Sequence, residues 1–316
     1  MCNIVLLFVF ILAFVQGYYS TNPLNNRAIC ENKAYPPDIK NGCCGIDGSF
    51  GNKIVGGSNT AIDQYPWAAL IEYVPLNTTL IKQNLLLCGG SLISSKYVLT
   101  AAHCFFMSEG LVKPEYVRLG EYNTTNNGKD CVEVEGGGID CTDPVVIIEI
   151  KRYIHHPQYM FYESKNDIAL IQLKKSAPYT DFIRPICLPT HDIFKSPPAR
   201  LKLRAVGWGV INDKYDISEI KQHIILPFVR VKECQRRYIG SKHSPITDDQ
   251  ICAGGEKNRD TCTLDSGGPL MFESEASYVL VGITSFGPVP CGLEDTPGVY
   301  VNVYNYLPWI LNITGS

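Results

Sequence analysis

From Ile54 onward, Gly, Pro and Asn divide the sequence into short apolar or β-branched runs, and this pattern constrains the fold most. Runs of this length and composition are typical of β-strands separated by turns. The final segment differs, because Val303, Leu307, Ile310 and Leu311 follow helical spacing. We therefore expect an all-β fold that ends in one amphipathic helix. The clearest expected strands cover residues 67–74, 85–88, 97–100, 145–150, 168–173, 201–206 and 279–284.

The composition indicates a folded chain and argues against a nucleic-acid partner. Apolar residues make up 45% of the 316 residues and charged residues 19%, so the chain can build a core and is not expected to be disordered. The formal net charge is -3, which provides no basic field for a phosphate backbone.

Residues 1–17 have the organisation of a secretory signal peptide. Every residue from Ile4 to Val15 is apolar, and Val15 and Gly17 supply small side chains for a cut after Gly17. A membrane helix takes roughly 20 apolar residues, which this run does not reach. An uncleaved anchor is the alternative, since no Lys or Arg precedes the run. We expect a secreted, extracellular protein without a membrane partner, with glycosylation sequons at Asn77, Asn123 and Asn312.

Residues 18–53 are a polar segment with no apolar period of 2 or 3.6, so they cannot form a core alone. They contain Cys30, Cys43 and Cys44. The chain has 13 cysteines, and removal of Cys2 with the signal leaves an even number. An even cysteine count in a secreted chain predicts a disulfide framework of up to six bonds, with the pairing left open.

Three short motifs carry the residue types that amide hydrolysis by a serine hydroxyl requires. His103 stands beside a cysteine in residues 99–104, Asp167 heads an apolar run in residues 166–170, and Ser266 lies in the Gly-rich turn of residues 265–269. Such chemistry needs a nucleophile, a base and a carboxylate that orients the base. Each motif alone also fits a structural role: a histidine near a disulfide, a strand-capping aspartate and a tight turn. Their joint presence in the order His, Asp, Ser favours catalysis.

With residues 54–57 (Ile-Val-Gly-Gly), 207–209 (Gly-Trp-Gly) and 298–300 (Gly-Val-Tyr), these motifs make residues 54–316 resemble a chymotrypsin-fold, trypsin-like serine protease. The resemblance implies two packed six-stranded antiparallel barrels. His103 and Asp167 would come from the first barrel and Ser266 from the second, with the site in the cleft between them. It also implies an oxyanion hole built from the backbone N–H groups of Leu264 and Ser266. The family usually has Gly where Leu264 stands, so this donor is the point most in question.

The resemblance also implies a substrate preference. Asp260, six positions before Ser266, corresponds to the floor of the family's specificity pocket, where a buried carboxylate selects Arg or Lys. Gly287 and Gly298 match the glycines of the pocket walls. Phe286 stands where the family usually has Trp and keeps an aromatic wall. The alternative is a surface aspartate with incidental glycines.

By the same resemblance the chain is a zymogen. A cut after Lys53 would expose the α-amino group of Ile54, which would then pair with the carboxylate of Asp265 and order the pocket and the oxyanion hole. The cut at Lys53 can come from an upstream protease or from the enzyme itself.

The disulfide pairs that we expect follow only from the family pattern, and they would leave a monomeric enzyme of two linked chains after activation. The extra Cys131–Cys141 pair resembles that of arthropod clip-domain serine proteases. The upstream module of those proteases has six cysteines, whereas residues 18–53 have three, so this segment would be a reduced module or none. That subgroup implies a role in extracellular cascades of immunity or development. The pairs are Cys88–Cys104, Cys131–Cys141, Cys234–Cys252, Cys262–Cys291, Cys44–Cys187 and Cys30–Cys43.

The expected partners are a protein substrate, an activating protease and a serpin-type inhibitor. We expect no cofactor: the acidic loop of residues 121–143 could hold Ca²⁺, but such loops are more often simply solvated, and His155–His156 reads as a loop rather than a zinc site. Two rival functions remain: a weak or non-catalytic homologue that binds a protein partner, which Leu264 favours, and a matrix-binding module dominated by residues 18–53, which no repeat or charged patch supports.

Overall fold

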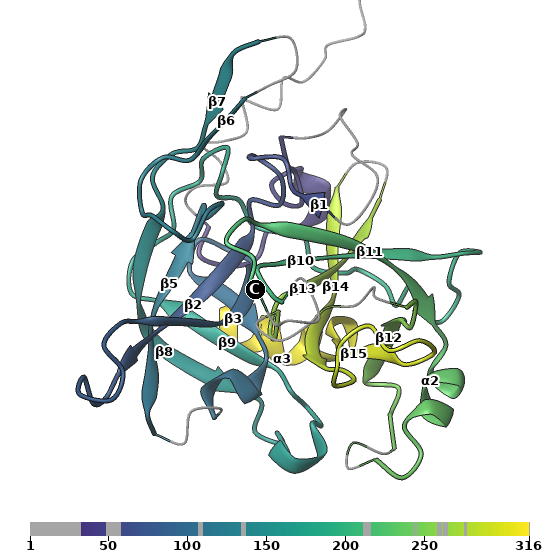
Figure 1. Ribbon diagram of the computed structural model, residues 1–316. Helices are drawn as coiled ribbons and strands as arrows, with labels where there is room; N and C mark the ends of the chain where they lie inside the picture. Colours follow the sequence, from purple (N-terminus) through teal and green to yellow (C-terminus); the bar gives the residue numbers. More distant parts are fainter. Residues whose placement is uncertain are drawn as a thin grey trace, which may run out of the picture.

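The computed structural model describes residues 33–48, 58–106, 110–133, 137–210, 216–241, 243, 245–257, 261, 265–274 and 277–315. Within these residues it confirms the expected architecture, because two antiparallel β-barrels lie side by side (Figure 1). Few helices accompany the barrels. No helix among the described residues is both long and apolar enough to cross a membrane.

The first barrel is closed by antiparallel pairing of six strands around a core of aliphatic and aromatic side chains. Ile71, Leu99 and Leu170 are among the side chains that are completely buried in it. In order around the barrel the strands are β2 (Ala68–Pro75), β3 (Leu85–Leu92), β4 (Tyr97–Thr100), β9 (Ala169–Leu173), β8 (Val146–His155) and β5 (Val112–Leu119).

The second barrel closes in the same way, because β12 pairs with β15 on one side and with β11 on the other. Leu203, Leu226 and Tyr300 are completely buried in its core. The short strand β1 (Ser58–Asn59) is added to β11 outside the ring. The ring consists of β11 (Gln222–Val229), β10 (Lys202–Gly207), β13 (Pro269–Glu273), β14 (Tyr278–Phe286), β15 (Pro297–Asn302) and β12 (Gln250–Gly254).

The helical spacing at the end of the chain is confirmed, with a modest difference at its start. A 3₁₀ turn, η5 (Val303–Tyr306), leads into α3 (Leu307–Thr314), and Gly315 ends the helix in the left-handed conformation. The helix α2 (Val231–Arg237) is not anticipated by the sequence pattern. A hairpin of β6 (Cys131–Glu133) and β7 (Ile139–Cys141) projects away from the barrels (Figure 1).

Residues 33–48 contact both barrels, the first through hydrogen bonds from the hydroxyls of Ser94 and Ser95 and the second near Tyr278. The N–H of Gly45 donates to the carbonyl of Pro185, and the N–H of Tyr278 donates to the carbonyl of Gly45, both at 2.8 Å. A β-carbon on Gly45 would stand 2.2 Å from the Tyr278 carbonyl oxygen, so only glycine allows this approach. The segment contains a single 3₁₀ turn, η2 (Ile39–Asn41).

Four of the expected disulfides are confirmed. Cys43 and Cys291 are also disulfide-bonded, and their expected partners Cys30 and Cys262 lie outside the described residues. Because Cys44 belongs to the N-terminal segment and Cys187 to the body of the protein, one bond fixes that segment covalently. The four confirmed pairs are Cys44–Cys187, Cys88–Cys104, Cys131–Cys141 and Cys234–Cys252.

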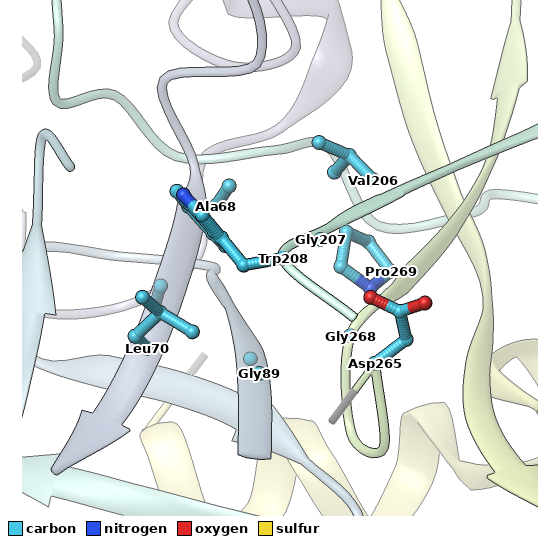
Figure 2. Close-up of a pocket in the computed structure, with 11 residues that line it drawn as sticks. Ala68, Leu70, Gly89, Val206, Gly207, Trp208, Asp265, Gly268 and Pro269 are labelled. Carbon is cyan, nitrogen blue, oxygen red and sulfur yellow. The ribbon is translucent and has the colours of Figure 1, made fainter. Parts of the chain in front are cut away.

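The barrels meet closely along β2, β3 and the start of β13. A β-carbon on Gly89 of the first barrel would stand 3.1 Å from the Cα of Gly268 in the second. Figure 2 shows the small pocket between these segments, which has no room for a water molecule. This dry contact holds the two halves of the candidate site against each other.

Candidate active site

His103 lies in the 3₁₀ turn η3 (Ala102–Phe105), three residues after the end of the buried strand β4. Asp167 lies two residues before β9, and β9 pairs with β4 along its length. This pairing places the two side chains side by side, although 64 positions separate them in the sequence. The ring Nδ1 of His103 is 2.8 Å from Oδ2 of Asp167, and the backbone N–H of His103 donates to Oδ1 at 2.8 Å.

The Asp167 carboxylate is 1% exposed, yet three donors surround it. Besides the two groups of His103, the hydroxyl of Ser285 donates to Oδ2 at 2.5 Å. Burial alone would raise the pKa of Asp167, but the charge of His103 and these hydrogen bonds outweigh it and lower the pKa. The carboxylate therefore stays ionised. Nothing in the sequence pointed to Ser285, which is 118 positions away from Asp167.

The interaction between Asp167 and His103 also determines the basicity of the His103 imidazole. Burial lowers the pKa of His103, whereas the charge of Asp167 and its hydrogen bond raise it, and the net result is a raised pKa. The carboxylate also fixes the ring, because it faces Nδ1 and leaves Nε2 as the nitrogen that can accept a proton.

Ser266 lies in a tight turn that packs against the segment containing His103. Its carbonyl oxygen accepts a 2.8 Å hydrogen bond from the N–H of Gly89 and lies 3.8 Å from Sγ of Cys104. Gly267 follows with φ of 77°, and a β-carbon there would stand 2.2 Å from Oγ1 of Thr100. The glycine thus permits the turn to approach strand β4, and the serine is half-buried next to the histidine turn.

The carboxylate of Asp265, one residue before the serine, lies against residues 207–209. The N–H of Gly209 donates to Oδ1 at 2.9 Å. β-Carbons on Gly207 and Gly209 would stand 2.0 and 2.4 Å from the carboxylate oxygens. Figure 2 shows the Asp265 carboxylate beside Gly207 and Pro269, at the barrel interface. The glycines of the Gly-Trp-Gly motif therefore make room for this acidic side chain.

The residues expected to form the specificity pocket are only partly described. Gly298 is buried in β15 opposite Ala253, and Gly287 is exposed directly after β14. Phe286, the last residue of β14, stacks on the ring of His243 with centroids 4.2 Å apart. His243 in turn contacts the hydroxyl of Ser164 through Nδ1 at 3.1 Å. Asp260, Leu264, Lys53 and Ile54 lie outside the described residues.

We searched the described part of the chain for side chains that could hold a metal ion together. One group of possible ligand atoms is compact, namely those of Cys88, His103 and Cys104. It does not suit a metal ion, because the two sulfur atoms are joined in a disulfide and offer no thiolate.

In the loop expected to favour calcium, the carboxylate of Glu121 pairs with the buried Arg118 at 2.8 Å, so the protein itself supplies a counter-charge. The pKa of Glu121 is raised by burial despite this pairing. Calcium binding by residues 121–143 stays a prediction.

The adjacent histidines are placed differently from each other. His155 is the last residue of β8 rather than part of a loop, and His156 follows in the loop. The His156 ring packs edge-on against Tyr306 and Trp309, and burial lowers its pKa.

A buried, ionised carboxylate that fixes a basic imidazole, with a half-buried serine in a turn that contacts the histidine segment, is the residue set of a serine hydrolase, and the two barrels define its chymotrypsin-fold class. Comparisons with known proteins agree. The trypsin family model matches residues 54–310. The phenoloxidase-activating enzyme of Bombyx mori is 50% identical over 309 residues, which cover 93% of this chain and 68% of that protein. Melanization protease 1 of Drosophila melanogaster is 40% identical over 84% of this chain and 66% of its own length.

A solved structure shares the fold. The crystal structure of the Drosophila Grass clip serine protease of the Toll pathway aligns with a TM-score of 0.71 at 31% identity, covering 86% of this chain and 74% of that one. The chain belongs to the trypsin family of serine endopeptidases, and it spans about two thirds of the length of the two curated relatives named above. The resemblance to clip-domain proteases is thereby confirmed.

Proposed function

We propose that this protein is a secreted zymogen that, once cut after Lys53, cleaves peptide bonds after Arg or Lys by a Ser266–His103–Asp167 mechanism. The observation that carries the proposal is the double hydrogen bond between His103 and the buried carboxylate of Asp167. A carboxylate in this position holds the imidazole in the tautomer whose Nε2 can accept a proton from a serine.

In the proposed mechanism, Oγ of Ser266 attacks the scissile carbonyl while Nε2 of His103 takes its proton. The carboxylate of Asp167 stabilises the imidazolium that forms. The oxyanion is bound by the N–H groups of Leu264 and Ser266. His103 then gives the proton to the leaving amine, the acyl-enzyme forms, and water repeats the sequence to release the acid.

Asp260 and Asp265 carry the other two parts of the proposal. A carboxylate at Asp260 would leave an unpaired buried charge with any substrate residue except a cation, which favours Arg and Lys. For activation, Asp265 already lies beside Gly209 at the barrel interface, close to the turn that holds Ser266. We propose that the ammonium of Ile54 joins this carboxylate after cleavage and thereby orders the oxyanion hole.

The biological setting is proposed from the relatives. Their names include a phenoloxidase-activating enzyme, a melanization protease and a Spaetzle-processing enzyme, and the first and third names describe action on another protein. We propose that this chain likewise cleaves a protein precursor outside the cell.

The test combines covalent labelling with turnover. The full chain, cut after Lys53, should be labelled at Ser266 by a fluorophosphonate and should hydrolyse Arg amides far faster than Phe amides. The Lys53→Gln variant should remain inert, and Ser266→Ala serves as the unlabelled control. The second candidate, a weak homologue that binds a partner, predicts no labelling and no turnover after the cut, and it rests on Leu264 in the oxyanion loop.

A further inference from the structure

The residue before Asp167 has an unusual backbone conformation. Asn166 has φ of 53°, in the left-handed region that residues other than glycine seldom adopt. Its carbonyl oxygen accepts a 2.8 Å hydrogen bond from the N–H of Ile168, so residues 166–168 form a tight three-residue turn with Asp167 at its centre. The direction of the Asp167 carboxylate therefore depends on how Asn166 is held.

The side-chain amide of Asn166 is bound at both ends by other segments of the chain. Its Oδ1 accepts a 3.0 Å hydrogen bond from the hydroxyl of Tyr306, and its Nδ2 donates at 2.9 Å to the carbonyl of Gln158. Gln158 lies eight positions earlier, whereas Tyr306 lies 140 positions later, in η5. These two bonds fix the orientation of the amide, and the backbone of Asn166 is fixed with it.

Tyr306 is itself held in place. Its side chain is buried, and the ring of His156 packs edge-on against it with the centroids 5.4 Å apart. The side chain of Asn302, at the start of η5, accepts a hydrogen bond from the N–H of Tyr304 and so stabilises the turn that contains Tyr306. The Tyr306 hydroxyl therefore has a defined position beside Asn166.

The protonation of these groups suits a hydroxyl that donates. Burial raises the pKa of Tyr306, and the charges of Asp249 and Asp167 raise it further, so the phenol keeps its proton. The ring also contacts His156, whose pKa is lowered by burial, so this imidazole is largely neutral at about pH 7. The hydrogen bond to Asn166 is therefore present wherever the proposed reaction can run.

We propose that Tyr306 is a positioning residue for the proposed catalytic reaction. Its hydroxyl holds Asn166 in the left-handed conformation, and this turn directs the Asp167 carboxylate toward His103. The inference rests on the proposed function and adds a distant determinant to it. The turn η5 follows β15, the last strand of the second barrel, and yet reaches the carboxylate of the first.

Removal of one hydroxyl tests the proposal, because Tyr306→Phe keeps the buried ring. In the full chain cut after Lys53, we expect kcat on an Arg amide to fall about tenfold per fluorophosphonate-titrated site, with KM changed by less than about twofold. The midpoint of the kcat/KM pH profile should move to lower pH, because a less well aligned carboxylate raises the pKa of His103 less. Tyr304→Phe is the matched control, since Tyr304 lies in the same turn and contacts Lys195 through its ring.

A double-mutant cycle shows whether Tyr306 acts through Asn166. Glycine adopts the left-handed conformation readily, so Asn166→Gly keeps the turn and removes the amide that the hydroxyl binds. In the Asn166→Gly background, Tyr306→Phe should change kcat by less than about twofold. A further loss of about tenfold in that background would mean that the hydroxyl acts by another route, and it would overturn the proposal.

The remaining outcomes separate this proposal from the proposed function. If the activated parent hydrolyses the Arg amide and Tyr306→Phe keeps its kcat and its pH midpoint, the positioning role is wrong and the proposed function stands. A lower thermal transition with unchanged kinetics has the same meaning, because it shows a purely structural role. An equal loss of activity in Tyr304→Phe also contradicts the positioning role. An activated parent without turnover overturns the proposed function, and the positioning role fails with it.

Discussion

His103 and Asp167 are joined at two points, because one carboxylate oxygen accepts the backbone N–H of the histidine and the other faces its ring nitrogen. The backbone bond fixes the position of the carboxylate, and the side-chain bond fixes the direction of the ring. The imidazole thus has a defined orientation before any substrate binds.

Asp167→Asn should abolish most of the activity without unfolding the protein. The amide can keep a similar shape, but it can donate to Nδ1 and so favour the wrong tautomer of His103. We expect kcat to fall by about 10⁴-fold on an Arg amide. Thermal denaturation followed by circular dichroism should give a transition close to that of the parent protein. A loss of less than tenfold would show that the carboxylate does not control the imidazole.

The pH dependence of activity should follow the titration of His103. The base must be neutral, so activity is lost as the pH falls through its pKa and is full above it. Because Asp167 raises that pKa above the ordinary 6.5, the midpoint of the kcat/KM profile should lie above this value, within a rise from roughly pH 6 to 8. Asp167→Asn should shift any residual midpoint to lower pH. Activity that is flat from about pH 5 to 9 would contradict the assignment.

Gly209→Ala should impair activation rather than folding of the zymogen. The new methyl group would stand 2.4 Å from a carboxylate oxygen of Asp265, so that side chain must move. We expect a loss of about tenfold or more in turnover after the Lys53 cut, together with weaker fluorophosphonate labelling. Gly128→Ala is the matched control, because neither Gly128 nor Gly209 has a left-handed backbone, and a β-carbon at Gly128 meets only the side-chain oxygen of the exposed Asn126, at 3.2 Å. Equal effects of the two substitutions would refute the explanation.

Leu264→Gly should raise the turnover of small amide substrates. The family usually has glycine at this position, where the backbone N–H aims at the oxyanion, and a branched side chain disfavours some of the conformations open to glycine. One oxyanion donor contributes on the order of 3 kcal/mol, or about a hundredfold in rate, so even partial misalignment is measurable. Unchanged or lower turnover would mean that the loop already accommodates leucine.

Cleavage after Lys53 should leave two chains that do not separate. The Cys44–Cys187 bond joins residues on either side of the cut. The activated protein should therefore run as one band without reductant and as two with it. Cys44→Ser with Cys187→Ser should release the smaller chain. Separation of the unmodified chains without reductant would contradict the pairing.

The sequence predicted the parts of the fold whose pattern is local. Strands such as Tyr97–Thr100 are continuous apolar runs, and the run matches the strand. The strand Val112–Leu119 was not recognised, because Lys113, Pro114 and Glu115 interrupt its pattern where it leaves the core. The short helix Val231–Arg237 has no side-chain hydrogen bond at its N-cap, so the sequence held no capping signal that would have indicated this helix.

The candidate site shows the same difference between residues with a local sequence pattern and contacts between distant segments. Motifs located His103, Asp167 and Ser266, since each stands in a recognisable local context. Ser285 and the pairing of Asp265 with Gly209 depend on contacts between distant segments, and no local pattern encodes them.

The attachment of residues 33–48 to both barrels has a consequence for recognition. Gly45 accepts a hydrogen bond from the strand that begins at Tyr278, and the Cys44–Cys187 bond does not depend on the activation cut. Under the proposed activation, an antibody that binds this stretch would therefore detect the uncut and the cut protein equally, and a reagent meant to report the cut must be raised against the new amino terminus at Ile54 instead.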